Sequence, residues 1–169
     1  SFEGLLLKTK KFDIAREVLL TMVRDVKYGL VPNGYSGYDN RPLYNSVDAS
    51  LLLFEQVQKY IEYTKDYKFV KENIYKKLES IIDNYISGNN FDNNNIYLDK
   101  DGLIASGTDD TQNTWMDAKY NNIAVTPRNG KAVEINAMWY NANMIMANLT
   151  IKMGDLLRIK KYKELAKKC

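Results

Sequence analysis

Residues 114–151 read TWMDAKYNNIAVTPRNGKAVEINAMWYNANMIMANLTI, and they join two kinds of sequence whose order decides the fold. The first part is polar and contains the run Pro-Arg-Asn-Gly at 127–130, which is typical of a loop. The second part, from about Ala132 to Ile151, is apolar on most faces of a helix, as interior helices are. The stretch therefore predicts a long loop that leads into an interior helix.

An earlier part of the chain repeats this order. Residues 29–45 are rich in Gly, Pro, Asn and Tyr, which is loop composition. They precede a predicted helix over 47–63, for which Ser46 is a suitable N-cap. Gly29 stands where a helix C-terminus favours glycine. Three further helices, with apolar residues at helical spacing, are predicted at Phe12–Tyr28, Phe69–Ile86 and Leu156–Ala166.

The connections between these helices alternate between short turns and long loops. The long ones, 29–45 and 87–130, exceed the length of about 12–15 residues above which loops are uncommon unless they are functional. Ile96–Leu98 and Leu103–Ala105 flank DKDG in the second loop and predict a small β-hairpin. We therefore predict one all-α domain over 1–169, layered, with a pocket at the end where the long loops gather.

The composition excludes several kinds of chemistry. Histidine is absent, and the one cysteine is Cys169. Ser-His-Asp and Cys-His catalysis are therefore excluded, and a disulfide framework or a cysteine metal cluster is excluded as well. Acid–base chemistry would fall to carboxylates, lysines or tyrosines. We expect no metal and no cofactor.

The basic residues gather near the end of the chain. Residues 152–168 hold seven Lys or Arg against two acidic residues, while the whole chain carries a formal charge of +3. This pattern fits the solvent face of an amphipathic helix, so we expect neither a nucleic acid nor a membrane partner. With no signal peptide and no long apolar span, the expected location is cytoplasmic.

Asp117 is the first candidate for chemistry. It directly follows Trp115 and Met116, and apolar neighbours disfavour the charged form of a carboxylic acid. A general acid needs to hold its proton in this way. An aspartate in this position can equally cap a turn, so a buried polar junction and a pocket for a neutral polar ligand such as a sugar both remain open.

Two other carboxylates lie in the first turns of the predicted interior helices. Asp48 is placed where the helix dipole favours a negative charge, and this structural role alone would explain it. Glu134 follows Arg128, and the two side chains would form either an ion pair that fixes the loop or direct contacts with a sugar.

Two long stretches resemble a known family. They are GLVPNGYSGYDNRPLYNSVDASLLLFEQVQKYIEYT at 29–64 and TWMDAKYNNIAVTPRNGKAVEINAMWYNA at 114–142, and both resemble the C-terminal amylo-α-1,6-glucosidase domain of glycogen debranching enzymes. The resemblance extends along nearly the whole chain, with a poor match over 87–110. It implies part of an (α/α)6 toroid and an inverting hydrolysis of α-1,6-linked glucose stubs on glycogen or another branched α-glucan.

The resemblance also implies roles for single residues. Asp117 would be the catalytic acid, and the family's base would come from a later segment that this chain lacks. Glu134 and Asp48 are candidate substitutes for the base within the chain. The residues that would line the glucose subsite or hold its loops are Trp115, Arg128, Glu134, Trp139, Tyr44, Asn45 and Asp48.

The sequence predicts fewer helices than a complete toroid of this kind needs. We therefore expect a part of a debranching enzyme that is inactive alone. Its inner helices would expose an apolar edge, and such edges drive association, here as a homo-dimer. Two alternatives remain: a related toroid glycosidase that acts on another neutral sugar, or a noncatalytic helical piece that binds carbohydrate or serves as a scaffold.

Overall fold

Six α-helices carry most of the regular structure in the computed structural model, which describes residues 1–169. Short helical turns at Glu3–Leu7 and Phe91–Asn93 accompany them. The fold is therefore mainly helical, as predicted, and is consistent with part of a helical toroid. The helices are α1 (Phe12–Arg24), α2 (Asp48–Thr64), α3 (Tyr67–Asn73), α4 (Tyr75–Ser87), α5 (Val133–Met153) and α6 (Leu156–Lys168).

Three two-stranded antiparallel hairpins lie in the long loops. The predicted hairpin in the second loop is confirmed, but the other two were not predicted. Each of their strands is only two residues long, too short for an alternating pattern to be recognised. The hairpins are β1 (Gly34–Tyr35) with β2 (Pro42–Leu43), β3 (Tyr97–Leu98) with β4 (Ile104–Ala105), and β5 (Lys119–Tyr120) with β6 (Ile123–Ala124).

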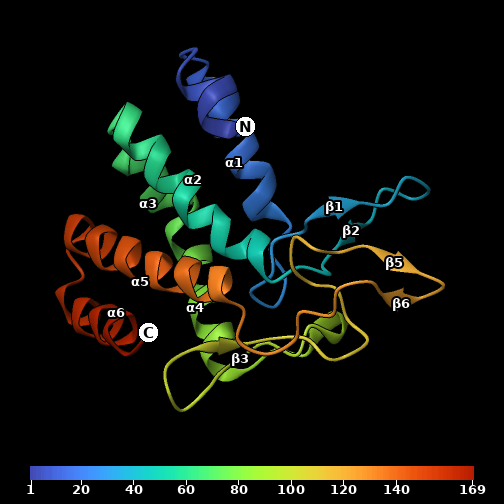
Figure 1. Ribbon diagram of the computed structural model, residues 1–169. Helices are drawn as coiled ribbons and strands as arrows, with labels where there is room; N and C mark the ends of the chain where they lie inside the picture. The colour runs from blue at the N-terminus through green and yellow to red at the C-terminus, as the bar shows by residue number, and fades with distance from the viewer.

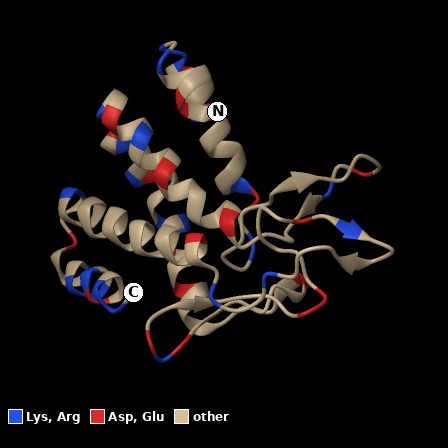
Figure 2. Cartoon of the chain, viewed as in Figure 1, with Lys and Arg blue, Asp and Glu red and all other residues tan.

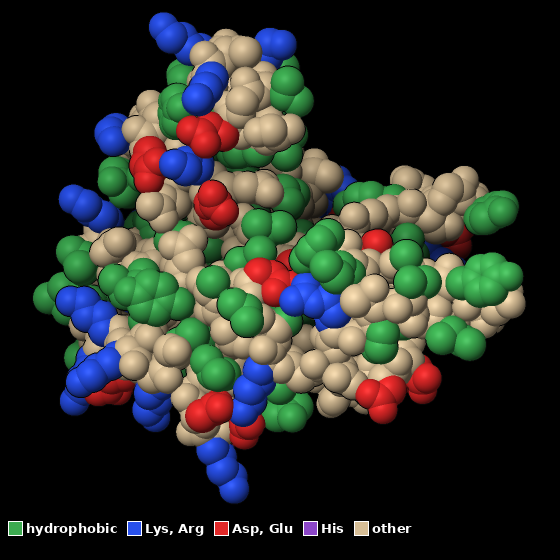
Figure 3. Space-filling view, viewed as in Figure 1, with side chains coloured by type: hydrophobic (Ala, Val, Ile, Leu, Met, Phe, Trp, Pro, Cys, Tyr) green, Lys and Arg blue, Asp and Glu red, His purple; other side chains and the backbone are tan.

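The two long loops gather at one end of the helices. In Figure 1, α2 and α5 both begin near the hairpins on the right and run away from them to the left. Hairpins β1–β2 and β5–β6 extend outward there, and hydrophobic side chains lie exposed at their ends (Figure 3), among them Tyr38 and Tyr120. The predicted gathering of the long loops is confirmed.

Helix α5 lies between α2 and α6 (Figure 1) and packs against both. Its buried residues include Ile135, Trp139, Ala142 and Met146, which recur at helical spacing. One stripe is nevertheless open: Val133, Tyr140 and Ile151 are 82%, 48% and 47% exposed. These three positions fall on one face of the helix. Helix α5 is thus an interior helix with an uncovered apolar edge.

The loops are fastened to the helices by buried contacts. Asn136 of α5 accepts a hydrogen bond from the backbone N–H of Ile104 at 2.7 Å and donates one to the Ile104 carbonyl at 3.0 Å. The second loop's Ile96 and Ile104 also join the same buried cluster as the helices. The loop end is therefore built onto the core.

Two predicted helices differ from the structure: one is divided in two, and the other ends earlier than expected. The helix expected over 69–86 is divided at the buried Ile74, whose backbone (φ −117°, ψ −42°) departs from helical values. An unbroken apolar period could not reveal this bend. Helix α1 ends at Arg24, and Gly29 instead adopts φ +71° in a turn where a Cβ atom would clash with the side chain of Asn84.

Lys and Arg gather on α6 (Figure 2), and Lys160 and Lys163 are exposed. Two other basic residues face α4: Lys161 pairs with Asp83 at 2.6 Å, and Arg158 pairs with the buried Glu79. The exposed lysines agree with the predicted solvent face. None of the helices combines the length and the apolarity that crossing a bilayer would require.

Candidate functional site at the loop end

Arg128 and Glu134 form the firmest contact at the loop end. Arg128 donates from Nη2 to Oε2 of Glu134 at 2.8 Å, and its Nη1 donates to Oε1. Their side chains are 24% and 27% exposed. The hydrogen bond from Arg128 is the main cause that holds the pKa of Glu134 below its ordinary value. Of the two interpretations offered for this pair, the structure shows the ion pair.

Trp115 lies beside this ion pair. A weaker interaction with its side chain also lowers the pKa of Glu134. The Trp115 side chain is 64% exposed, so the indole is available at the surface. An aromatic ring next to hydrogen-bonding groups is a suitable surface for a neutral sugar, because it combines an apolar face with polar edges.

Asp117 is exposed, two residues before the first residue of β5. The expectation that indole and thioether groups enclose its carboxyl group is wrong within this chain, because Asp117 is itself exposed, as is Trp115. No hydrogen bond or ion pair engages the Asp117 side chain, so it does not cap a turn either. The structure therefore leaves the Asp117 carboxyl group free. It stands two residues after Trp115, which lies beside the pair of Arg128 and Glu134.

Asp48 has a structural role at the beginning of α2. It accepts a hydrogen bond from the hydroxyl group of Ser46, and the same hydroxyl oxygen accepts the N–H of Ala49 at 3.1 Å. Ser46 thus binds an N–H group of the first turn, but the predicted N-cap position is one residue early, because α2 begins at Asp48 and its N-cap residue is Val47. The favourable position of a carboxylate in this first turn explains Asp48 without a ligand.

Tyr44 holds the first loop in place. Its hydroxyl group donates to the carbonyl of Asp25 at 2.7 Å, and its ring meets Phe91 edge-on at 5.4 Å. The residue is 7% exposed, and burial raises its pKa. Asn45, next to it, is half-buried and faces a polar cavity.

Trp139 is a core residue and is fully buried. Its indole stacks on Tyr85 of α4 with ring centroids 6.1 Å apart. Tyr85 in turn donates to the carbonyl of Val47 at 2.7 Å. Of the two roles implied for Trp139, lining the subsite or holding its loops, only the second is compatible with this position.

Sequence reasoning missed two buried asparagines that join the loops. The side chain of Asn94 donates to the carbonyl of Tyr44 at 2.5 Å. The backbone carbonyl of Asn94 accepts a hydrogen bond from the side chain of Asn113 at 3.0 Å. The carbonyl of Asn113 accepts the N–H of Val47 at 2.8 Å. The N–H groups at the beginning of a helix lack partners within the helix. The need for an acceptor before α2 was the signal that could have found Asn113.

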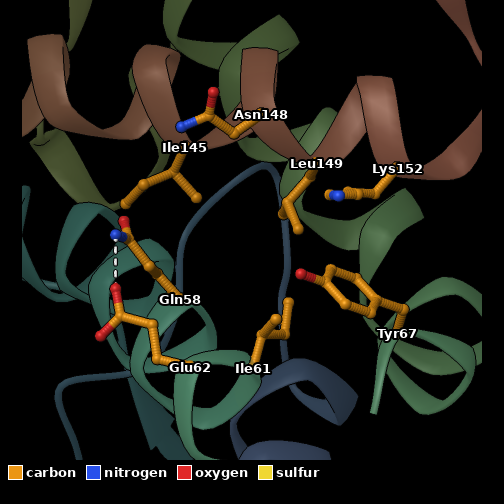
Figure 4. A pocket seen from close by; sticks show the side chains of 8 residues that line it. All are labelled: Gln58, Ile61, Glu62, Tyr67, Ile145, Asn148, Leu149 and Lys152. Atoms are coloured by element: carbon orange, nitrogen blue, oxygen red, sulfur yellow. Dashed lines mark hydrogen bonds between the residues drawn. The ribbon is translucent and has the colours of Figure 1, made fainter. Parts of the chain in front are cut away.

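A second hollow lies away from this site. It has a volume of about 180 Å³ and lies between the far halves of α2 and α5, where Ile61 and Leu149 face each other (Figure 4). Gln58 and Glu62, joined by a hydrogen bond of 2.8 Å, line one side. This hollow contains none of the predicted site residues.

Comparison with known proteins gives a consistent result. The family model described as amylo-alpha-1,6-glucosidase matches residues 1–169. The chain is also similar to the glycogen debranching enzyme of Saccharomyces cerevisiae, at 28% identity over 203 aligned positions that include 90% of this chain. The chain spans only 13% of the length of that relative. It therefore belongs to the amylo-alpha-1,6-glucosidase family.

Proposed function

We propose that this chain supplies the catalytic acid and part of the glucose subsite of a glycoside hydrolase that removes α-1,6-linked glucose stubs from glycogen or limit dextrin. The observation that carries the proposal is the free carboxyl group of Asp117. Glu134 and Asp48 are engaged by Arg128 and Ser46, whereas Asp117 is available to a ligand. Membership of the amylo-alpha-1,6-glucosidase family supports a glycoside hydrolase reaction.

Inverting hydrolysis needs two carboxyl groups roughly 6.5–9.5 Å apart, with a water molecule between the base and the anomeric carbon. In the proposed reaction, Asp117 gives its proton to the glycosidic oxygen as the bond to the anomeric carbon breaks. A second carboxylate, outside these residues, accepts a proton from the attacking water. Glu134 is a poor candidate for that base because Arg128 stabilises its charged form.

The exposed position of Asp117 has a consequence for this proposal. A general acid works best in a dry and partly apolar setting. The remainder of the parent protein would supply that setting, together with the base. The chain alone would then be inactive.

The exposed indole of Trp115 is the proposed contact for the glucose ring. Its neighbour Glu134 can accept hydrogen bonds from sugar hydroxyl groups while Arg128 holds it in place. Removal of Trp115 would therefore weaken binding of the glucan, whereas removal of the Asp117 carboxylate would slow the chemical step.

The test is release of glucose from a limit dextrin by the full-length parent protein. Asp117→Asn should lower the rate by about a hundredfold or more, the range observed when a general acid is removed. Asp13→Asn, an exposed carboxylate in the first turn of α1, is the matched control and should keep the rate. Unchanged glucose release by Asp117→Asn would remove Asp117 from the mechanism.

The exposure of Asp117 also favours a second candidate, a noncatalytic piece that binds carbohydrate. In that case maltodextrin would quench Trp115 fluorescence equally in the wild type and in Asp117→Asn, and the full-length protein would release no glucose. A related glycosidase for another neutral sugar would instead cleave a different member of a substrate panel.

A further inference from the structure

A polar cavity of about 700 Å³ lies among the loops at the same end of the molecule. We call it the asparagine cavity. None of its lining residues is hydrophobic. Its wall comes from four parts of the loops, at Asn45, 90–95, 108–113 and Lys119. Lys119 stands two residues after Asp117, so the cavity adjoins the segment that carries the proposed acid.

One lining residue is buried with an unused hydrogen-bonding atom. Asn94 is 1% exposed. Its side-chain nitrogen donates to the carbonyls of Tyr44 and Phe91, at 2.5 and 3.0 Å, which fixes the orientation of the amide. Its Oδ1 atom has no partner in the chain. This oxygen has less than 1 Å² of exposed area, so Asn94 shapes the cavity wall and leaves contacts with a ligand to the amides that reach the cavity surface.

Other amides in the wall are free. The side chains of Asn45, Asn90 and Gln112 line the cavity and make no hydrogen bond within the chain. Each amide offers two N–H donors and a carbonyl acceptor. Such groups match a ligand whose own groups both donate and accept, as hydroxyl groups do.

The charge of the wall argues for a neutral ligand. Asp92, Asp110 and Lys119 are its charged residues, so the charges nearly cancel. Nowhere does the structure bring together three or more acidic, His or Cys side chains in a way that could hold a metal ion. Since the wall also lacks apolar residues, a lipid or another hydrophobic ligand does not fit.

We propose that the asparagine cavity binds a segment of neutral oligosaccharide. Its identification as an α-glucan rests on the proposed function, with the segment being the chain that carries the stub. The free amides of Asn45, Asn90 and Gln112 contact the sugar hydroxyl groups. The cavity thereby holds the glucan beside the loop of Asp117 without taking part in bond cleavage.

Calorimetric titration of the 169-residue chain with maltopentaose tests this proposal. Asn90→Leu with Gln112→Met removes two free amides, and each lost hydrogen bond costs a few-fold in affinity, so the pair should weaken binding roughly tenfold. Gln56→Met, a half-buried glutamine of α2 outside the cavity, is the matched control and should bind as the wild type. Circular dichroism confirms that all variants fold alike.

Asp92→Asn with Asp110→Asn separates a sugar from a cation, because it removes charge but keeps shape and polarity. Maltopentaose affinity should stay within about threefold. Tight binding of calcium chloride that this variant loses, with no binding of maltopentaose, would overturn the proposal. Equal weakening by Gln56→Met would overturn it as well. The titration measures binding of the sugar and not glucose release. Its result therefore tests the cavity even if the chain takes no part in the proposed hydrolysis.

Discussion

Arg128 donates two hydrogen bonds to Glu134, and this pair joins the loop that follows Pro127 to the first turn of α5. A paired guanidinium and carboxylate in a fork geometry is a strong contact when both groups are partly withdrawn from water. By stabilising the charged form of Glu134, the pair also argues against this residue as the base of the proposed reaction. Its strength and its titration can both be measured.

Arg128→Met should destabilise the chain by about 1–3 kcal/mol, because it leaves the half-buried carboxylate of Glu134 without its partner. Urea unfolding measures the change. Arg41→Met breaks an ion pair with Asp39 whose side chains are 74% and 54% exposed. This control should cost no more than about 0.5 kcal/mol. Equal losses for the two variants would show that the Arg128 pair is merely a surface contact.

The same pair predicts a dependence of stability on pH. The pKa of Glu134 is lowered in the folded state from its ordinary value of 4.5. The contribution of the Glu134 carboxylate to the unfolding free energy is therefore complete above that value. It is lost as the pH falls through the lower pKa of the folded state. The difference in unfolding free energy between wild type and Glu134→Gln should shrink as the pH falls below 4.5. A constant difference would contradict the assignment.

The two tryptophans should behave in opposite ways. Trp139→Ala removes a fully buried side chain and should cost about 3–5 kcal/mol of stability. Trp115→Ala removes an exposed one and should change stability by less than about 0.5 kcal/mol, while it weakens binding of maltodextrin. Thermal unfolding and a sugar titration of both variants provide the measurements. A large loss of stability for Trp115→Ala would contradict this prediction and show that the indole packs against the rest of the protein.

The uncovered stripe of α5 predicts association of the chain at high concentration. Val133, Tyr140 and Ile151 form its apolar side chains, and exposed apolar patches bring proteins together. Val133→Glu with Ile151→Glu should shift sedimentation toward the monomer. Leu5→Glu, at an exposed leucine of the N-terminal turn, should leave it unchanged. A wild-type chain that sediments as a monomer at every concentration would contradict this prediction.

Local patterns were enough to predict most of the helical framework. Helix α2 begins at Asp48, one residue after its predicted start, and α5 ends at Met153 with Gly154 (φ +80°) as its C-cap residue, so both helices lie close to their predicted bounds. The bend at Ile74 could not be predicted, because the same spacing of apolar residues occurs in one straight helix and in two consecutive helices. It is tertiary packing that draws this side chain into the core.

The site was harder to predict than the fold. Trp115 and Trp139 belong to one sequence motif, yet one is exposed and the other is buried. The stripe of Ile135, Trp139 and Ala142 could have shown that Trp139 faces the core. Nothing comparable marked Asn94 and Asn113, since polar loop residues look alike until the partners from another loop are known. The role of Asp117 stays a prediction.

The hydrogen bond from the N–H of Val47 to the carbonyl of Asn113 makes the beginning of α2 a reporter of movement in the second long loop. The amide proton of Val47 is shielded by the carbonyl of Asn113, which lies 66 positions further along the chain. Deuterium can replace that proton only when the distant segment lifts away. Exchange at this one amide therefore times the opening of the whole loop end, including any slowing that an occupied cavity would impose.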